Sequence, residues 1–361
     1  ELQGDGRTFT QKNAEARLKE AIDLLNADMA GRRLFSGRAV DKNPVVSYDL
    51  IMNGDGTRAG LRQMIQERKD AELGAPRPDG FRLGRLSLTS NLTDSVTLAY
   101  EAASLPSGSK IDRIERTGTA MSISSPASPA ASTVTLTGQP AEGDTIAIVL
   151  TDPDNVSQAV TLKASATAPQ PGSTGSFKIG ATTAETVASI EAALSAAVGE
   201  KANAVLGSRA AIVTAEAFFA GSLSSPPQRI AGPAMTATGF TAGTAADTVI
   251  WYQGDDDPTI AARTTAPVRT DQTQVVAAGA RANEAGTRHL LAQFGALAAD
   301  SFTDSRADAL RYAALNEKVF DRLSDKPSNP KVSDIAAELA TAANTMKSAK
   351  ERHLSTKALM L

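Results

Sequence analysis

The sequence predicts an α+β protein in which helices from both chain ends form an elongated, coiled-coil-like bundle, with a β-rich α+β domain inserted between them. Apolar residues recur at helical spacing near both ends of the chain. In the middle, apolar and polar residues alternate, as they do in short strands. Charge density also divides the chain. Only 14 of the 77 Asp, Glu, Lys and Arg residues fall in residues 117–250, although this stretch is more than a third of the chain. The middle is therefore predicted to be a separate unit.

These patterns give a domain prediction. Residues 1–75 and 249–361 form a discontinuous helical shaft domain, and residues 76–248 form an outer β-rich domain. Within the outer domain, residues 117–248 are its low-charge insert. A stretch rich in Ser, Pro and Ala at residues 122–132 leads into this insert, as linkers of that composition do.

The first segment of the shaft domain is predicted to be a helix that is capped at Thr10 and ends at Gly31. Four apolar residues at steps of four, three and four form one stripe along it. They are Leu18, Ile22, Leu25 and Met29. A strand and turn over residues 32–37 and a second helix over residues 57–73 are expected to follow.

The far end is predicted to hold helices over residues 284–299 and 305–323, and a last helix that begins at Pro330. The apolar seam of this last helix is spaced four, three, four and three, the heptad pattern of a coiled coil. It comprises Ile335, Leu339, Ala342, Met346 and Ala349. We expect this seam to pair with the stripe of the first helix.

The middle unit is predicted to contain strands at residues 133–136, 145–150, 159–163 and 176–179. Each stretch is either apolar or alternates apolar with polar residues, and residues typical of turns separate the stretches. Two helices, at residues 184–198 and 209–219, are expected to belong to the same unit.

Composition argues against several function classes. The net charge of −3 and the pI near 5.6 give no basic face for nucleic acid. No apolar run approaches the roughly 18–20 residues of a membrane span. The chain has no cysteine, which excludes thiol catalysis and zinc–thiolate sites. Partners are therefore expected to include neither nucleic acid nor membrane.

The polar motifs give no catalytic constellation. The two histidines, His289 and His353, each lack a second histidine four residues away, as a helical zinc site would require. Three aspartates at residues 255–257 lack the spacing of a calcium loop and are interpreted as an exposed acidic turn. Residues 53–56 are interpreted as a turn and helix cap. We therefore expect no enzyme, no cofactor and no metal.

Several short motifs resemble one known family. Residues 31–37 read Gly-Arg-Arg-Leu-Phe-Ser-Gly, residues 53–57 read Asn-Gly-Asp-Gly-Thr, and residues 279–284 read Gly-Ala-Arg-Ala-Asn-Glu. With residues 226–229 and 249–252, they are similar to the flagellin superfamily, closest to the hook-associated (hook–filament junction) protein of α-proteobacteria. True flagellins usually differ at the first of these motifs.

This resemblance implies a structural role in cell motility, outside the cell in the bacterial flagellum, after export without a cleaved signal peptide. It implies as partners a neighbouring hook-associated protein, flagellin, further copies of the full-length protein and an export chaperone. It also implies terminal polymerisation helices beyond both ends of residues 1–361. Two alternatives stay open: a filament flagellin, and a flagellin-like cell-surface protein that binds polysaccharide.

The candidate site residues are therefore interface or shaft-packing residues. On the helices they are Leu18, Ile22, Leu25, Met29, Ile335, Leu339 and Met346. Leu34, Phe35, Ile250 and Trp251 are expected to pair at the tip of the shaft. The competing interpretation of the helix stripes is that they form intramolecular core.

Overall fold

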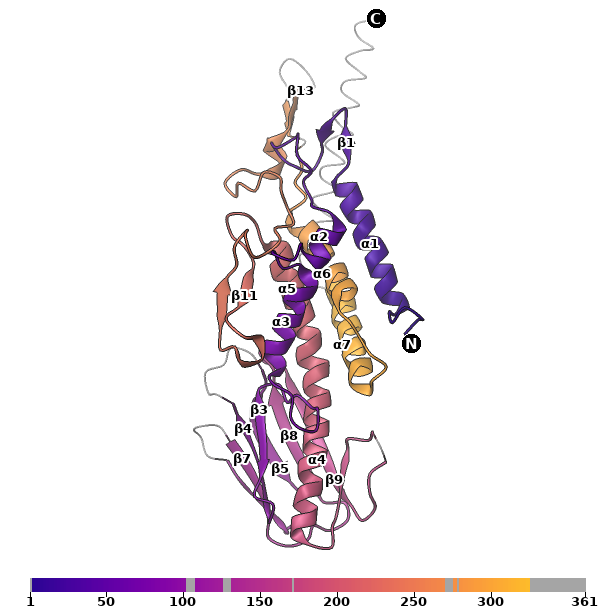
Figure 1. Ribbon diagram of the computed structural model, residues 1–361, viewed down its shortest axis with the longest axis vertical. Coiled ribbons are helices and arrows are strands. Elements are labelled where there is room, and N and C mark those ends of the chain that lie inside the picture. The colour runs from indigo at the N-terminus through magenta and orange to yellow at the C-terminus, as the bar shows by residue number, and fades with distance from the viewer. Residues whose placement is uncertain are drawn as a thin grey trace, which may run out of the picture.

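The computed structural model describes residues 2–101, 108–125, 131–170, 172–269, 275–277 and 279–324. It confirms the α+β class. Two bodies lie end to end along the long axis, a helical body and a β body, and one long helix runs from one into the other (Figure 1). Each body has its own hydrophobic core.

Segments from distant parts of the chain build the helical body. Its helices are α1 (Phe9–Leu25), α2 (Tyr48–Asn53), α3 (Leu61–Leu73), α5 (Ser208–Ala220), α6 (Ala285–Ala299) and α7 (Arg306–Leu323). Helix α6 packs against α1, α5 and α7, and α5 also packs against α3. The predicted helices near residues 284–299 and 305–323 are thereby confirmed.

The first helix differs from its prediction at both ends. It begins two residues earlier than expected, because its cap is Thr8, which forms a capping box with Gln11. It ends at Leu25, since Asn26 turns the chain and exchanges two hydrogen bonds with the backbone of Val45. The next residues form a hairpin of β1 (Asp28–Met29) and β2 (Arg32–Arg33), with Gly31 at positive φ. Met29 therefore leaves the helical stripe.

Two four-stranded sheets form the β body. The first has the antiparallel order β3-β4-β7-β6, from β3 (Leu86–Ser90), β4 (Ser95–Tyr100), β6 (Met121–Ser124) and β7 (Ala131–Leu136). The second has the order β10-β9-β8-β5, from β5 (Lys110–Arg116), β8 (Thr145–Thr151), β9 (Ser157–Ser165) and β10 (Ser176–Lys178). The four predicted strands fall in β7 to β10, and the sequence reading missed β3 to β6.

The long helix consists of α4 (Thr183–Ala202), a π-helical segment (Asn203–Gly207) and α5. Helix α4 packs its apolar face into the core of the β body. The prediction that residues 209–219 belong to the middle unit is wrong, because Phe218 and Phe219 of α5 lie in the helical core. Small hairpins complete the described chain: β11 (Gln228–Ile230) with β12 (Phe240–Ala242), and β13 (Pro267–Arg269) with β14 (Val275–Ala277).

The predicted last helix, from Pro330 through the heptad seam, lies outside the described residues, so the coiled-coil shaft stays a prediction. Within the described part of the chain, no helix is both long and apolar enough to cross a membrane.

Candidate functional site

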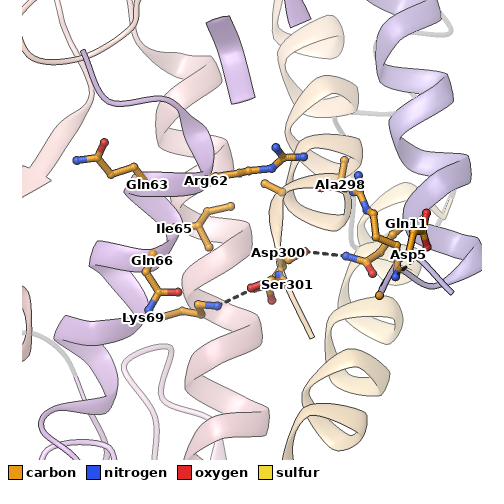
Figure 2. Close-up of a pocket in the computed structure, with 13 residues that line it drawn as sticks. Asp5, Gln11, Arg62, Gln63, Ile65, Gln66, Lys69, Ala298, Asp300 and Ser301 are labelled. Carbon is orange, nitrogen blue, oxygen red and sulfur yellow. Dashed lines mark hydrogen bonds and ion pairs between the residues drawn. The ribbon is translucent and has the colours of Figure 1, made fainter. Parts of the chain in front are cut away.

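A buried polar cluster, here called the polar junction, joins helices of the helical body. Figure 2 shows two of its residues, Lys69 and Asp300. Lys69 of α3 and Arg311 of α7 both pair with Asp300, which follows α6. The Lys69 Nζ to Asp300 Oδ1 distance is 2.7 Å, and the Arg311 Nη1 to Asp300 Oδ2 distance is 2.5 Å. The Asp300 side chain is fully buried, and the two cations are nearly so. Both carboxylate oxygens are thus committed to cations.

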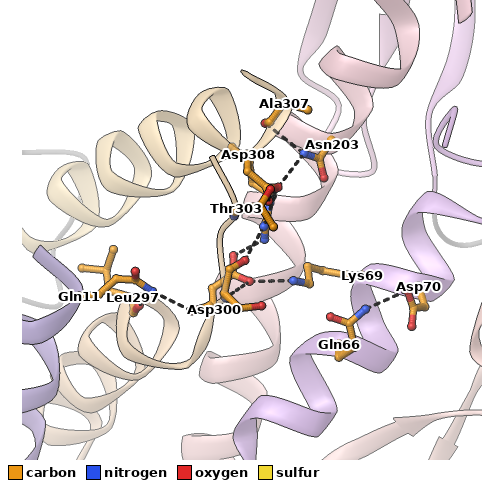
Figure 3. A network of polar contacts seen from close by, with 12 residues as sticks. Gln11, Gln66, Lys69, Asp70, Asn203, Leu297, Asp300, Thr303, Ala307 and Asp308 are labelled. Atoms are coloured by element: carbon orange, nitrogen blue, oxygen red, sulfur yellow. Dashed lines mark hydrogen bonds and ion pairs between the residues drawn. The ribbon is translucent and has the colours of Figure 1, made fainter. Parts of the chain in front are cut away.

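The first helix enters the same junction through Gln11. Its amide oxygen accepts from the backbone N–H of Thr8, and its amide nitrogen donates to the carbonyl oxygens of Asp300 (2.7 Å) and Leu297 (3.4 Å). Gln11 therefore caps α1 and satisfies free carbonyls at the C-terminal end of α6. The network reaches the π segment, where Asn203 donates to the carbonyl oxygen of Ala307 at 3.0 Å (Figure 3).

An open pocket of about 530 Å³ lies above the junction, between α3, α6 and the start of α1 (Figure 2). Its two arginines are already engaged. Arg7 donates to Glu15 and to the Ala298 carbonyl oxygen, and Arg62 donates to Asn53. The physical effect of this arrangement is to fix α1, α3, α6 and α7 relative to one another.

A second polar cluster contradicts one sequence interpretation. The acidic turn was expected to be exposed, but the Asp255 side chain is only 9% exposed and lies between Arg38 (2.6 Å) and Arg281 (3.0 Å). The hydrogen bond from Arg38, with the charge of Arg281, holds the pKa of Asp255 well below its usual range.

Replacing Asp255 with Asn should destabilise the protein near neutral pH and weaken its acid sensitivity. A carboxyl group whose folded pKa is depressed stabilises the fold above its unfolded pKa of about 3.9, and this stabilisation is lost as pH falls through the folded pKa. The difference in free energy of unfolding between wild type and variant, measured with urea, should therefore be larger at pH 7 than at pH 3. A constant difference across that range would contradict this assignment.

The motifs that carry the family resemblance meet in space beside this cluster. The N–H of Ala282 donates to the carbonyl oxygen of Phe35 at 2.8 Å, and the N–H of Gly37 donates to that of Ala280 at 3.2 Å. Residues 31–37 are thereby paired with residues 279–284. Close by, the N–H of Val46 donates to the carbonyl oxygen of Trp251 at 3.0 Å. Segments more than 200 residues apart therefore form one unit.

The predicted interface residues divide into three groups. Leu18, Ile22, Leu25, Ile250 and Trp251 are buried, and Phe35 is partly buried against the helical core. Met29 and Leu34 are exposed, by 69% and 44%. Ile335, Leu339 and Met346 lie outside the described residues.

The structure shows what two groups of predicted interface residues contact. The stripe of Leu18, Ile22 and Leu25 already belongs to the helical core, where α1 packs on α6, so it is not free for the C-terminal heptad. At the tip, the Trp251 ring packs edge-on against Phe219 with centroids 5.3 Å apart, and its Nε1–H donates to the Phe219 carbonyl oxygen at 2.9 Å.

Of the two histidines, only His289 lies in the described part of the chain. His289 lies 2.9 Å from the carbonyl oxygen of Arg322, and His353 is outside the described residues. Among the residues that the structure describes, no group of three or more acidic or histidine side chains could hold a metal ion.

Sequence reasoning missed the polar junction, although a signal was present. Lys69 falls four residues after Ile65, and Arg311 falls four residues before Leu315. Each cation therefore sits on the apolar stripe of its helix, where a charge must be paired when it is buried. The carboxylate that pairs with both could not be chosen from the sequence.

No family model, curated protein or solved structure matches the chain.

Proposed function

We propose that this protein is a structural component of the bacterial flagellum that joins the hook to the filament through packing between subunits. The observation that carries the proposal is the pairing of residues 31–37 with residues 279–284 through backbone hydrogen bonds. The motifs that resemble the junction protein are far apart in sequence, and their contact is what a shared structural role would require.

The arrangement of the two bodies supports the proposal. Residues from the first 75 positions and from the segment after 248 share one core, and the β body lies between them in sequence. A shaft made from both chain ends would carry the β body as an outward projection. We include in this proposal that the helices of the shaft pack as a coiled coil.

Exposed apolar side chains suggest where neighbouring subunits would bind. Phe9 and Leu24 are 70% and 62% exposed on the outer side of α1. Met29 and Leu34, on or beside the β1–β2 hairpin, are also exposed. Burial of large apolar side chains is a common source of association free energy. We assign these four residues, rather than the buried stripe, to subunit contacts.

Deletion of the gene in its host should leave cells with hooks but without attached filaments, and flagellin should accumulate in the medium. Electron microscopy of the cells and immunoblotting of the medium measure this, and expression of the wild-type protein should restore filaments.

Labelled antibody should mark one point between hook and filament. Labelling along the whole filament would instead assign the protein as a flagellin, and wild-type motility of the deletion strain would reject both roles.

A further inference from the structure

A groove of about 640 Å³ lies where the β body meets the helical body. Strand β9 forms one side, and the end of α4, the π segment and the outer face of α7 form the others. Figure 1 shows β9 at the side of the β body, below α7. Two apolar side chains that line the groove are substantially exposed, Val156 by 49% and Leu310 by 41%.

Most of β9 has a free edge along this groove. Strand β10 pairs with β9 only from Lys163 to Ser165. There the N–H of Lys163 donates to the carbonyl oxygen of Gly175 at 3.0 Å. Because strand backbone groups alternate with a period of two, those of Ser157, Ala159 and Thr161 point the same way. In the described part of the chain, no backbone group pairs with them on that side.

The opposite edge of the same sheet has protection that β9 lacks. Strand β5 carries five charged residues among seven and an irregular register between Ile111 and Arg113. Charges and bulges of this kind keep an edge strand from pairing with other chains. Residues 157–162 of β9 read Ser-Gln-Ala-Val-Thr-Leu, without charge or proline, and their pairing with β8 is regular. This edge is therefore suited to accept a strand.

We propose that an extended segment of a different polypeptide binds in this groove and adds a strand to the free edge of β9. Only a polypeptide backbone repeats donors and acceptors at the spacing that the edge presents. A second copy is poorly suited, because its own β9 edge is recessed in the same way. Its described strands of six or more residues are already paired in sheets, and its small hairpins have strands of only two or three residues.

The groove also restricts the chemistry of the segment. At one end Arg306 is paired with Glu200 at 3.2 Å. Between the ends, β9 contributes uncharged residues and α7 contributes Leu310, Ala313 and Ala314. Lys201 of α4 and Glu317 and Lys318 of α7 also line the groove. The segment should therefore place small or apolar side chains towards Leu310, Ala313 and Ala314, where a buried charge would lose water.

The probe is a capped peptide, Ser-Thr-Val-Thr-Leu-Thr, which repeats the uncharged sequence of residues 132–137. Amide hydrogen exchange of the full chain is measured by NMR with and without millimolar peptide. We expect exchange at Ser157, Ala159 and Thr161 to slow by at least about tenfold, because bound amides are protected. Exchange at Gln158 and Val160, which face β8, should not change.

Two variants test the same edge. Ala159→Pro removes an N–H that has no partner in β8, so the fold should survive while the peptide effect is lost. Thr161→Lys places a charge on the edge and should also abolish the effect, whereas Thr89→Lys, the same change on an exposed position of β3, should not.

Three results would overturn the proposal. One is unchanged exchange in the wild-type protein, and another is protection that persists in both β9 variants. The third is a concentration-dependent dimer, seen by light scattering, that Ala159→Pro abolishes, because it would assign the groove to a second copy.

Discussion

Replacing Asp300 with Ala should lower the free energy of unfolding of the helical body by about 3–5 kcal/mol. The carboxylate is fully buried and is the shared partner of Lys69 and Arg311. Its removal would leave Lys69 buried without its ion-pair partner, although Arg311 would keep Asp308 at 2.9 Å. A buried charge without compensation costs more than the pair itself contributes. Urea unfolding followed by far-UV circular dichroism measures the change.

A matched control is the exposed pair between Arg17 and Glu20, whose side chains are 62% and 58% exposed. Glu20→Ala should leave the free energy of unfolding almost unchanged, since exposed ion pairs contribute little. Replacement of the three charged residues Lys69, Asp300 and Arg311 with apolar side chains, Lys69→Met, Asp300→Leu and Arg311→Met, should recover most of the loss. Equal effects of Asp300→Ala and Glu20→Ala would show that the junction does not stabilise the helical body.

Helical periodicity predicted the helices well and their ends poorly. The stripe from Leu18 to Leu25 is buried as a helix face should be, yet Met29 continues the spacing and lies in a hairpin. The difference arises at Asn26, whose side chain binds the backbone of Val45, 19 residues away. A local pattern contains no information about such a contact, because its energy comes from tertiary structure.

The candidate site shows the same limit. Lys69 and Arg311 could have been flagged from their places on apolar stripes, but Asp300 becomes their partner only when α6 and α7 turn at that residue. The sequence around Asp255 likewise predicts an exposed turn, because it does not show that the fold brings Arg38 and Arg281 beside this residue. Sequence spacing identified residues that need a partner, and the fold determined which partner they have.

The position of α5 in the helical core changes which residues can be deleted as a separate domain. The low-charge insert predicted over residues 117–248 includes Phe218 and Phe219 of the helical core, so it cannot be removed as one unit. The chain enters and leaves the β body at one place instead. A Cβ atom at Gly84 would lie 2.7 Å from Cδ1 of Leu206 and 3.2 Å from Cβ of Ala202. Residues 85–201 are therefore the unit that can be removed without opening the helical core.

Two deletions should consequently behave in opposite ways. Removal of residues 85–201, with a short glycine linker, should leave a soluble helical protein that melts cooperatively, because the residues of the helical core are all retained. Removal of residues 122–247 should abolish cooperative melting. The loss of each buried phenylalanine costs about 3–5 kcal/mol, and a typical domain has only about 5–15 kcal/mol of stability. Trp251 would also lose the Phe219 ring and carbonyl that hold it. Circular dichroism melting curves of the two proteins distinguish these outcomes. A cooperative transition in the longer deletion, with the shorter one unfolded, would place α5 in the β body and reverse the boundary.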